Sequence, residues 1–390
     1  MLNPPETPGN PSKAPLVGPK DRQKRIYFPA LDGLRGIAIM AVIIWHCMPC
    51  CQSFFPGWAG VDLFFVLSGY LITGRLLDTK GQPGYFSRFY RNRILRIWPL
   101  YYALVIPFLL LLPYVGEINQ ADLTLYQQHP LSFLLFFQNW TFIRHGPIRD
   151  YSLGHLWSLA IEEQFYLVWP LIILFVRTPR RRIRLFVSLI LIGLTTRCIY
   201  YAFHLYGDDP VHIYYNTFFR ADGLLAGSLL CQLHRLHIKI SRVWSAVIVL
   251  VGLLSFPTVG MTTGWISPLI PFSVSVGYTL LAIVFACMLH LALQPKHLIA
   301  RLCEIRPLRW IGKISYGLYM IHMPVWIIVG NELFRISRKI NWTGHEKLLY
   351  WIVALICTLL SFFLSAISFR YFESFFLRLK TSPKPLPQKF

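Results

Sequence analysis

Long apolar runs recur along this chain from residue 31 almost to residue 376, and they constrain its fold more than any other feature. Many of them reach the roughly 20 residues that a helix needs to cross the hydrocarbon core of a bilayer. Only 14% of the 390 residues are charged and 55% are hydrophobic, whereas a soluble domain carries about 25% charged residues. The sequence therefore predicts an all-α polytopic membrane protein.

About ten transmembrane helices are expected from the apolar runs. They cover residues 31–50, 58–77, 97–115, 155–176, 183–204, 217–233, 243–257, 267–293, 309–330 and 348–372. Two further stretches do not fit a span: 131–140 is too short to cross, and 84–95 mixes aromatic and basic residues as an interfacial amphipathic helix does. Residues 1–26 and 377–390 are expected to be polar cytoplasmic tails that flank one transmembrane domain at 27–376.

The distribution of Lys and Arg predicts the orientation. If the N-terminus is cytoplasmic, more than twenty basic residues fall on the cytoplasmic side. The opposite loops then hold six, which are Arg144, Arg149, Arg335, Arg338, Lys339 and Lys347. This asymmetry follows the positive-inside rule and puts both termini in the cytoplasm. It also accounts for the formal net charge of +21, so we expect no binding to nucleic acid.

The first predicted span carries two ionisable residues at a spacing that places them on one helical face. Eleven residues separate Arg35 from His46, which is about 20° from three full turns and a rise of about 16 Å. A fixed cation at one end of a stripe and a titratable base at the other suit an elongated anionic ligand. The alternative is that Arg35 extends to the lipid headgroups and His46 only packs in the bundle.

Two other spans bring polar groups to a similar depth. Asp62 lies a turn inside the outer end of the second span, where its carboxylate can orient the His46 imidazole as a general base needs. The ninth span carries Tyr316 and, further outward, His322. A single buried histidine is usually structural, but two at one depth with acidic partners favour a polar cavity. His46, Asp62 and His322 are candidate catalytic residues, and Tyr316 is a supporting candidate.

The fourth span contains adjacent carboxylates, Glu162 and Glu163. Neighbouring helical positions point about 100° apart, so only one of the two is expected to face a polar cavity. The sequence does not decide which one, and Glu163 is taken as the catalytic candidate with Glu162 in support. Arg220 and Asp222, in the sixth span, are supporting candidates that pair with each other or with Glu162.

Three arginines precede the third span. Arg91, Arg93 and Arg96 lie within two turns of a helix, and guanidinium groups hold phosphates with paired hydrogen bonds. They are candidate donor-binding residues together with Arg35, although ordinary topology determinants look the same. Cys47, Cys50 and Cys51 cluster near the end of the first span, but no second ligand group completes a zinc site, so no metal is expected.

Several motifs in this order resemble the membrane-bound acyltransferase-3 family, whose members O-acetylate bacterial surface polysaccharides. The best marker is LDGLRGIAIMAVIIWH, in which Arg35 and His46 match the family's Arg-x10-His spacing. Other matching stretches are GVDLFFVLSGYLIT, RNRILRIWP, LWSLAIEEQFYLVWP, FRADGLLAGSLL, ISYGLYMIH and SFRYFE. Each is weak alone, but together they are specific, and the resemblance covers roughly residues 27–373.

This resemblance implies a ten-helix bundle in a bacterial cytoplasmic (inner) membrane. It implies that His46 serves as a general base or acyl relay and that Arg35, Arg93 and Arg96 serve the coenzyme A side. Acetyl-CoA is then a co-substrate and no cofactor is tightly bound. Some relatives carry an appended hydrolase-like domain, which we expect this chain to lack, so a separate protein could complete the transfer.

The leading hypothesis is therefore an O-acyltransferase that moves an acyl group, most simply acetyl, from cytoplasmic acyl-CoA to an outer hydroxyl. The acceptor is expected to be a surface polysaccharide or glycolipid, such as lipopolysaccharide, and membrane lipid surrounds the chain. A multi-pass transporter or flippase is the alternative, because buried charges also line transport pathways. No internal repeat of the transporter kind is seen, and the sequence leaves a homo-oligomer open.

Overall fold

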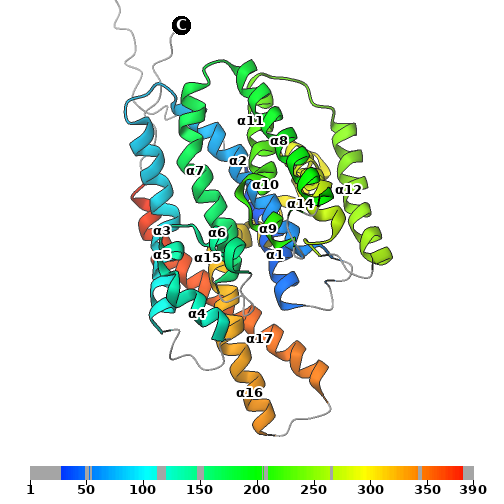
Figure 1. Cartoon of the computed structure of the whole chain (residues 1–390). Helices are drawn as coiled ribbons and strands as arrows, with labels where there is room; N and C mark the ends of the chain where they lie inside the picture. Colours follow the sequence, from blue (N-terminus) through cyan, green and yellow to red (C-terminus); the bar gives the residue numbers. More distant parts are fainter. Residues whose placement is uncertain are drawn as a thin grey trace, which may run out of the picture.

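The computed structural model is built of helices packed along one another, with no strand among the residues it describes (Figure 1). These residues are 28–48, 52, 55–111, 120–146, 153–203, 205, 210–263, 267–340 and 345–380. The tail predicted at 1–26 lies outside the described residues, as do Cys50, Cys51 and all of the tail predicted at 377–390 except residues 377–380. The all-α fold class is confirmed.

The helices have the following bounds. In the first half they are α1 (Pro29–Cys47), α2 (Gly60–Thr79), α3 (Tyr85–Leu111), α4 (Gln120–Gln128), α5 (Pro130–Leu134), α6 (Gln138–His145), α7 (Trp157–Phe175) and α8 (Pro179–Ala202). In the second half they are α9 (Val211–Tyr215), α10 (Thr217–Arg220), α11 (Asp222–Arg235), α12 (Arg242–Thr263), α13 (Tyr278–Ala292), α14 (Leu298–Cys303), α15 (Arg306–Val325), α16 (Asn331–Lys339), α17 (Glu346–Ile367) and α18 (Ser374–Arg378).

Each of the ten predicted spans overlaps a helix, and seven helices of the described chain are long and apolar enough to cross a membrane. The other three fall short for visible reasons. Helix α11 has only 14 residues, α12 qualifies only as a shorter apolar helix over Arg242–Ser255, and α15 starts with Arg306, Arg309 and Lys313. The chain is a multi-pass membrane protein, while the count of ten and the orientation stay predictions.

Two segments that were not expected to span behave differently from each other. The amphipathic stretch at 84–95 is not a separate interfacial helix, because it forms the first part of the continuous helix α3. The apolar stretch at 131–140 is divided between the short helices α5 and α6, in agreement with its length. The continuity of α3 matters because it holds the basic residues of that stretch rigidly against the bundle.

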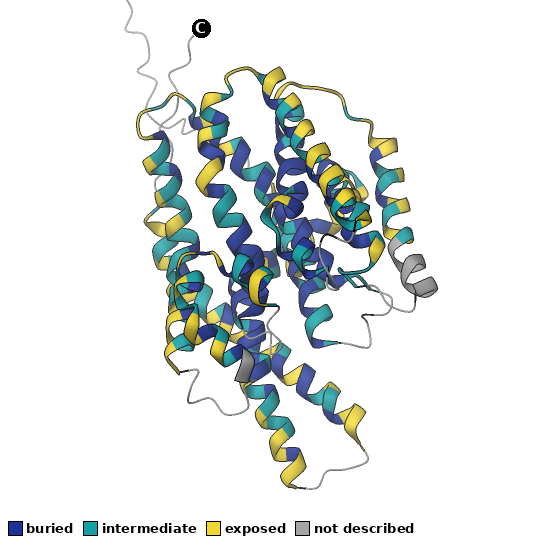
Figure 2. Cartoon of the chain, in the orientation of Figure 1, coloured by how far each residue is buried: buried dark blue, intermediate teal, exposed yellow. Residues whose placement is uncertain are grey.

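Burial separates an inner group of helices from an outer one (Figure 2). In α1 and in the helical segment Gly57–Thr79, which contains α2, 61% of the apolar window is buried, compared with 17% in α8 and 22% in α3. Large apolar side chains such as Phe203 and Val243 are more than 70% exposed. Such exposure suits helices whose outer faces contact lipid tails instead of water.

Helix α1 packs against α15 with almost no space between the two backbones. A Cβ atom on Gly312 would lie 1.7 Å from the backbone oxygen of Asp32, and one on Gly36 would lie 2.3 Å from that of Leu308. Small residues at helix interfaces let membrane helices approach in this way. Glycines therefore set the separation of the two helices that carry His46 and His322.

Helices α2 and α11 approach by the same device. A Cβ atom on Gly227 would lie 2.0 Å from the oxygen of Val66, and one on Gly69 would lie 1.9 Å from that of Leu224. The hydroxyl of Thr73 donates to Ser228 Oγ at 2.8 Å across this contact. The core is thus organised around two close helix pairs, α1 with α15 and α2 with α11.

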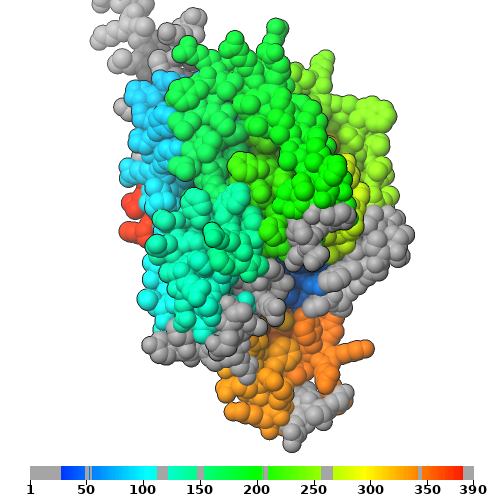
Figure 3. Space-filling model, in the orientation of Figure 1, coloured from blue at the N-terminus to red at the C-terminus, as the bar shows by residue number. Residues whose placement is uncertain are grey.

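Helices α15 and α17 both continue through π-helical turns. Residues 326–330 join α15 to α16, and residues 368–373 join α17 to α18. Helix α16 and the first part of α17 extend beyond the main body of the molecule, where they form the orange projection in Figure 3. Turns of this kind often occur at functional sites, and Phe369, in the second one, lines the cavity described below.

The glycine contact between α1 and α15 generates a prediction about stability. Gly312→Ala forces a methyl group onto the Asp32 backbone oxygen, so we expect it to lower the free energy of unfolding by about 1–3 kcal/mol or more. Thermal unfolding of the purified protein in detergent measures this change. Gly74→Ala is the matched control, since its Cβ would meet its nearest atom, Cys231 Sγ, at 3.4 Å. Equal melting temperatures for the two variants would contradict the packing argument.

Candidate active site

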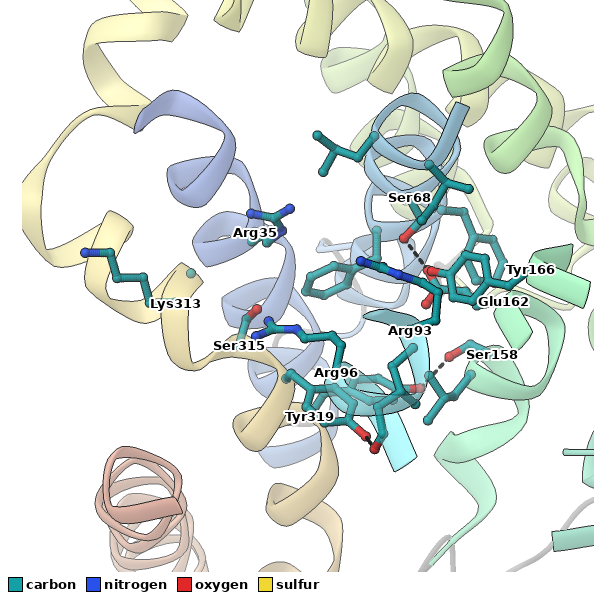
Figure 4. Close-up of a pocket in the computed structure, with 18 of the residues that line it drawn as sticks. Arg35, Ser68, Arg93, Arg96, Ser158, Glu162, Tyr166, Lys313, Ser315 and Tyr319 are labelled. Atoms are coloured by element: carbon teal, nitrogen blue, oxygen red, sulfur yellow. Dashed lines mark hydrogen bonds between the residues drawn. The ribbon is translucent and has the colours of Figure 1, made fainter. Parts of the chain in front are cut away.

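A cavity of about 420 Å³ lies between five helices, at the end of the molecule where α1 begins. Its walls come from α1, α2, α3, α7 and α15, and residues from 369 to 380 complete them. Figure 4 shows the side chains of Arg35, Arg93 and Arg96 turned toward the same space from two different helices. The residues predicted to bind a donor from α1 and α3 are therefore brought together.

Six basic side chains line this cavity against two acidic ones. The basic ones are Arg35, Arg75, Arg93, Arg96, Lys313 and Lys380, and the acidic ones are Asp32 and Glu162. Arg35 and Asp32 form an ion pair at 2.7 Å. Aromatic rings support two of the others: Arg93 lies 5.8 Å from the ring centroid of Tyr166, and Arg96 lies 5.8 Å from that of Tyr316. The excess of positive charge makes this a site for an anion.

Lys380 follows the last helix and lies beyond the candidate membrane spans. Burial, together with the nearby guanidinium groups of Arg96 and Arg93, lowers the pKa of Lys380 to about 6. An anion in the cavity favours the protonated ammonium group and raises this pKa again. Anion binding near neutral pH is therefore coupled to proton uptake at Lys380.

The structure separates the two adjacent carboxylates of α7. Glu162 lines the cavity and accepts a hydrogen bond from Ser68 at 2.6 Å. Glu163 points toward α3 instead, where its carboxylate accepts from the Trp98 indole at 3.2 Å. The residue chosen as the catalytic candidate thus lies outside the cavity lining, and its supporting neighbour lies inside it. Their 100° separation around the helix produces this difference.

Tyr319 and Ser158 close the inner end of the cavity. Their hydroxyl groups are hydrogen bonded at 2.6 Å, and the Tyr319 hydroxyl also donates to the backbone oxygen of His155. Behind this pair, the ring of His155 lies 5.1 Å from the ring of His322, between centroids. A short series of polar groups therefore leads from the cavity to the histidine predicted on α15.

His46 and His322 contact each other directly, with 3.1 Å between His46 Nδ1 and His322 Nε2. The Nδ1 atom of His322 lies 3.0 and 2.9 Å from the backbone oxygens of Leu318 and Tyr319. Carbonyl oxygens only accept, so a neutral His322 carries its proton on Nδ1 and accepts at Nε2. His46 then donates from Nδ1, which leaves a lone pair on His46 Nε2. This is the arrangement of an oriented base.

Asp62 does not contact His46, contrary to the expectation from its depth. Its carboxylate pairs with the Arg220 guanidinium group at 3.0 Å, and both side chains are buried. The guanidinium group also lies 3.7 Å from the ring centroid of Tyr278 and 5.5 Å from that of Trp157. Arg220 therefore joins α2 to α10, and the partner that orients His46 is His322.

Asp222 belongs to a second buried pair, so the expected pairing of Arg220 with Asp222 or Glu162 is wrong. The Arg197 guanidinium group donates to Asp222 at 2.9 Å and to the Thr279 hydroxyl at 2.6 Å. These contacts tie α8, α11 and α13 together. Neither Arg220 nor Asp222 lines the cavity, and their geometry is that of structural cross-links.

The remaining predicted residues divide between the cavity and the surface. Tyr316 lines the cavity and donates to the backbone oxygen of Ile97 at 2.6 Å. Arg91 is exposed and does not line it. Sequence reasoning missed Arg75, Lys313 and Lys380 as cavity residues, although their positions at predicted span ends were visible. Among the described residues, no group of three His, Cys, Asp or Glu side chains could hold a metal.

Comparison with known proteins identifies the family of the chain. Residues 28–370 match the family described as an acyltransferase domain, acyltransferase-3. The chain is 31% identical over 368 residues to the peptidoglycan O-acetyltransferase OatA of Listeria monocytogenes, covering 90% of this chain and 56% of that protein. It is 28% identical over 367 residues to the O-acetyltransferase OatA of Staphylococcus aureus, covering 89% and 57%. The chain thus spans about half the length of these relatives. No solved structure matches it.

The buried pair of Asp62 and Arg220 generates a prediction that separates structure from chemistry. Asp62→Asn leaves the Arg220 charge buried without its counter-ion, so we expect a loss of about 3–5 kcal/mol in stability. The measurement is the thermal unfolding temperature in detergent. A second change, Arg220→Gln on the Asp62→Asn background, should recover part of that loss. If Asp62→Asn unfolds like the unmodified protein, the cross-link assignment is wrong.

Proposed function

This chain belongs to the acyltransferase-3 family, and from that membership we propose that it is a membrane O-acyltransferase. The reaction is the transfer of an acyl group, most simply acetyl, from cytoplasmic acetyl-CoA to a hydroxyl of a bacterial surface glycan. The observation that carries the proposal is the relation between the basic cavity and the histidine pair. One end of α1 contributes to an anion site, and the other end presents a base.

The charge of the basic cavity supports a coenzyme A donor. Coenzyme A carries phosphate groups at one end and its thioester at the end of a long flexible arm. Arg93 and Arg96 lie on one helix, and Arg35 faces them from another (Figure 4). Guanidinium groups bind phosphate oxygens with paired, charge-assisted hydrogen bonds. The arm would then extend along α1 toward Tyr319 and Ser158.

The base is His46 and its orienting partner is His322. In the transfer, His46 Nε2 takes the proton of the acceptor hydroxyl as its oxygen attacks the thioester carbonyl carbon. The new C–O bond forms, the C–S bond breaks, and the proton passes to the departing thiolate. The ring of Tyr319 lies 6.0 Å from that of His322, between centroids, and its hydroxyl would donate to the oxyanion that forms at the carbonyl after it leaves the His155 backbone oxygen. Glu162 contributes to the charge of the donor cavity instead.

The names of the relatives make peptidoglycan the first acceptor to test. The Listeria protein is named as a peptidoglycan O-acetyltransferase. Lipopolysaccharide or a glycolipid, which also carries sugar hydroxyl groups, is the second acceptor to test. A location in the bacterial cytoplasmic membrane puts the donor on one side and the acceptor on the other. The alternative function, a transporter or flippase, is less favoured, because membership of the acyltransferase-3 family supports acyl transfer.

Removing the base tests the mechanism. His46→Ala should keep normal membrane levels and normal donor binding, but lose glycan acylation by about 10²–10⁴-fold. His46→Gln should be equally inactive, since an amide forms hydrogen bonds but cannot accept the proton. Mass spectrometry of peptidoglycan and other surface glycans from complemented null cells, with immunoblots of the membrane fraction, measures both quantities.

The control for this test is His345→Ala, which changes an exposed histidine before α17 and away from the cavity. It should leave acylation unchanged. Substantial acylation by His46→Gln would mean that His46 is only structural. If the unmodified protein acylates another surface glycan and not peptidoglycan, the proposed acceptor is wrong and the proposed chemistry stands.

Removing charge from the cavity tests the donor site. Arg93→Ala combined with Arg96→Ala should weaken coenzyme A binding by about a hundredfold or more, because each lost charged hydrogen bond costs about 1.5–3 kcal/mol. Lysine at both positions should restore binding only in part, because it lacks the paired geometry. Isothermal titration in detergent gives the affinity. Arg91→Ala is the matched control, since it lies on the same helix but outside the cavity.

A further inference from the structure

A second cavity, of about 580 Å³, lies near the start of α1 and shares no lining residue with the first. Phe28 and Tyr70 form one side, and the ends of α11 and α13 form the other. The connection from α11 to α12 completes it with residues 237–240 and Arg242. The proposed acyl transfer gives this cavity no role.

The side chains that line this second cavity are basic or neutral, and none of them is acidic. Lys239 and Arg242 bring fixed positive charges, and both are exposed. His234, His237 and His290 add three imidazole rings. A concave surface with this composition attracts an anion and does not provide a counter-ion of its own.

Hydrogen bonds hold two of these imidazole rings in place. His234 Nε2 lies 2.9 Å from His290 Nδ1, and the Tyr70 hydroxyl lies 3.1 Å from His234 Nδ1. The side-chain nitrogen of Gln294 lies 3.5 Å from His290 Nδ1 and can only donate, so that ring nitrogen accepts. His234 then donates from Nε2 and accepts from the Tyr70 hydroxyl at Nδ1. This wall of the cavity is therefore ordered.

Exposed apolar side chains line the cavity or lie close to it in the sequence. Phe28 and Ile238 line it and are 42% and 45% exposed, and Trp244, two residues after Arg242, is 68% exposed. Tryptophan is enriched where membrane proteins meet the headgroup region, and basic pockets between helices at that level bind anionic lipid headgroups. The charge therefore lies beside a surface that suits lipid tails.

We propose that this second cavity binds the phosphate group of an anionic phospholipid. Lys239 and Arg242 pair with the phosphate oxygens, and the exposed His237 imidazole donates to them. The lipid tails lie along Phe28 and Ile238. The proposal is independent of acyl transfer, because its evidence is a different cavity and its readout is lipid binding.

The test is native mass spectrometry and thermal unfolding of the full chain in detergent, with added lipid. Phosphatidylglycerol should bind and raise the melting temperature, and phosphatidylcholine should do so much less. Lys239→Gln combined with Arg242→Gln should weaken phosphatidylglycerol binding by about tenfold. Both side chains are exposed, so the lipid-free variant should melt like the unmodified protein. If the double variant melts at a lower temperature, lipid binding is measured instead on the two single variants, Lys239→Gln and Arg242→Gln, by native mass spectrometry.

The matched control is Arg180→Gln combined with Arg181→Gln, which removes the same charge from exposed positions at the start of α8. That end of α8 contacts the end of α11 through a hydrogen bond from Arg182 to Gln232 at 2.7 Å. This control should bind phosphatidylglycerol normally. Equal loss in both double variants would overturn the proposal, as would equal binding of the two lipids. If glycerol phosphate alone raises the melting temperature as much as phosphatidylglycerol does, the ligand is a free phosphate and the lipid proposal is wrong.

Discussion

The site depends on how closely α1 and α15 approach each other. Gly36 and Gly312 leave no room for a side chain between the two backbones, and this separation allows His46 and His322 to form a hydrogen bond. The same contact puts Arg35 and Tyr316 into the walls of one cavity. Membrane helices gain no hydrophobic free energy by leaving lipid for each other, so close backbone packing has to provide the specificity of the pair.

Charged residues in this bundle serve two separate purposes. Arg220 with Asp62, and Arg197 with Asp222, are buried pairs with neutral aromatic or hydroxyl groups around them. Their charges are matched, so they fix the positions of α2, α8, α11 and α13. The cavity next to them is different because its basic groups outnumber its acidic ones. An excess of positive charge of this kind attracts an anion, and the balanced pairs hold the walls of the cavity in place.

Much of the fold follows from the sequence because lipid requires continuous apolar helices of nearly fixed length. The helices were predictable, and so was the relation of Arg35 to His46, since both belong to one helix with known periodicity. Helix α11 and helix α15 show where this reasoning weakens. One is short and the other starts with basic residues, so length and composition alone do not identify them as spans.

The sequence by itself determined the helical class, the residues with chemical potential and the order in which they occur along each helix. The tertiary structure decided which of them meet. It placed Glu162 rather than Glu163 in the cavity, gave Asp62 to Arg220, and brought Lys380 beside Arg96 from almost three hundred residues away. The physical reason is that periodicity fixes directions within one helix, whereas contacts between helices depend on rotation and depth, and packing sets both of these.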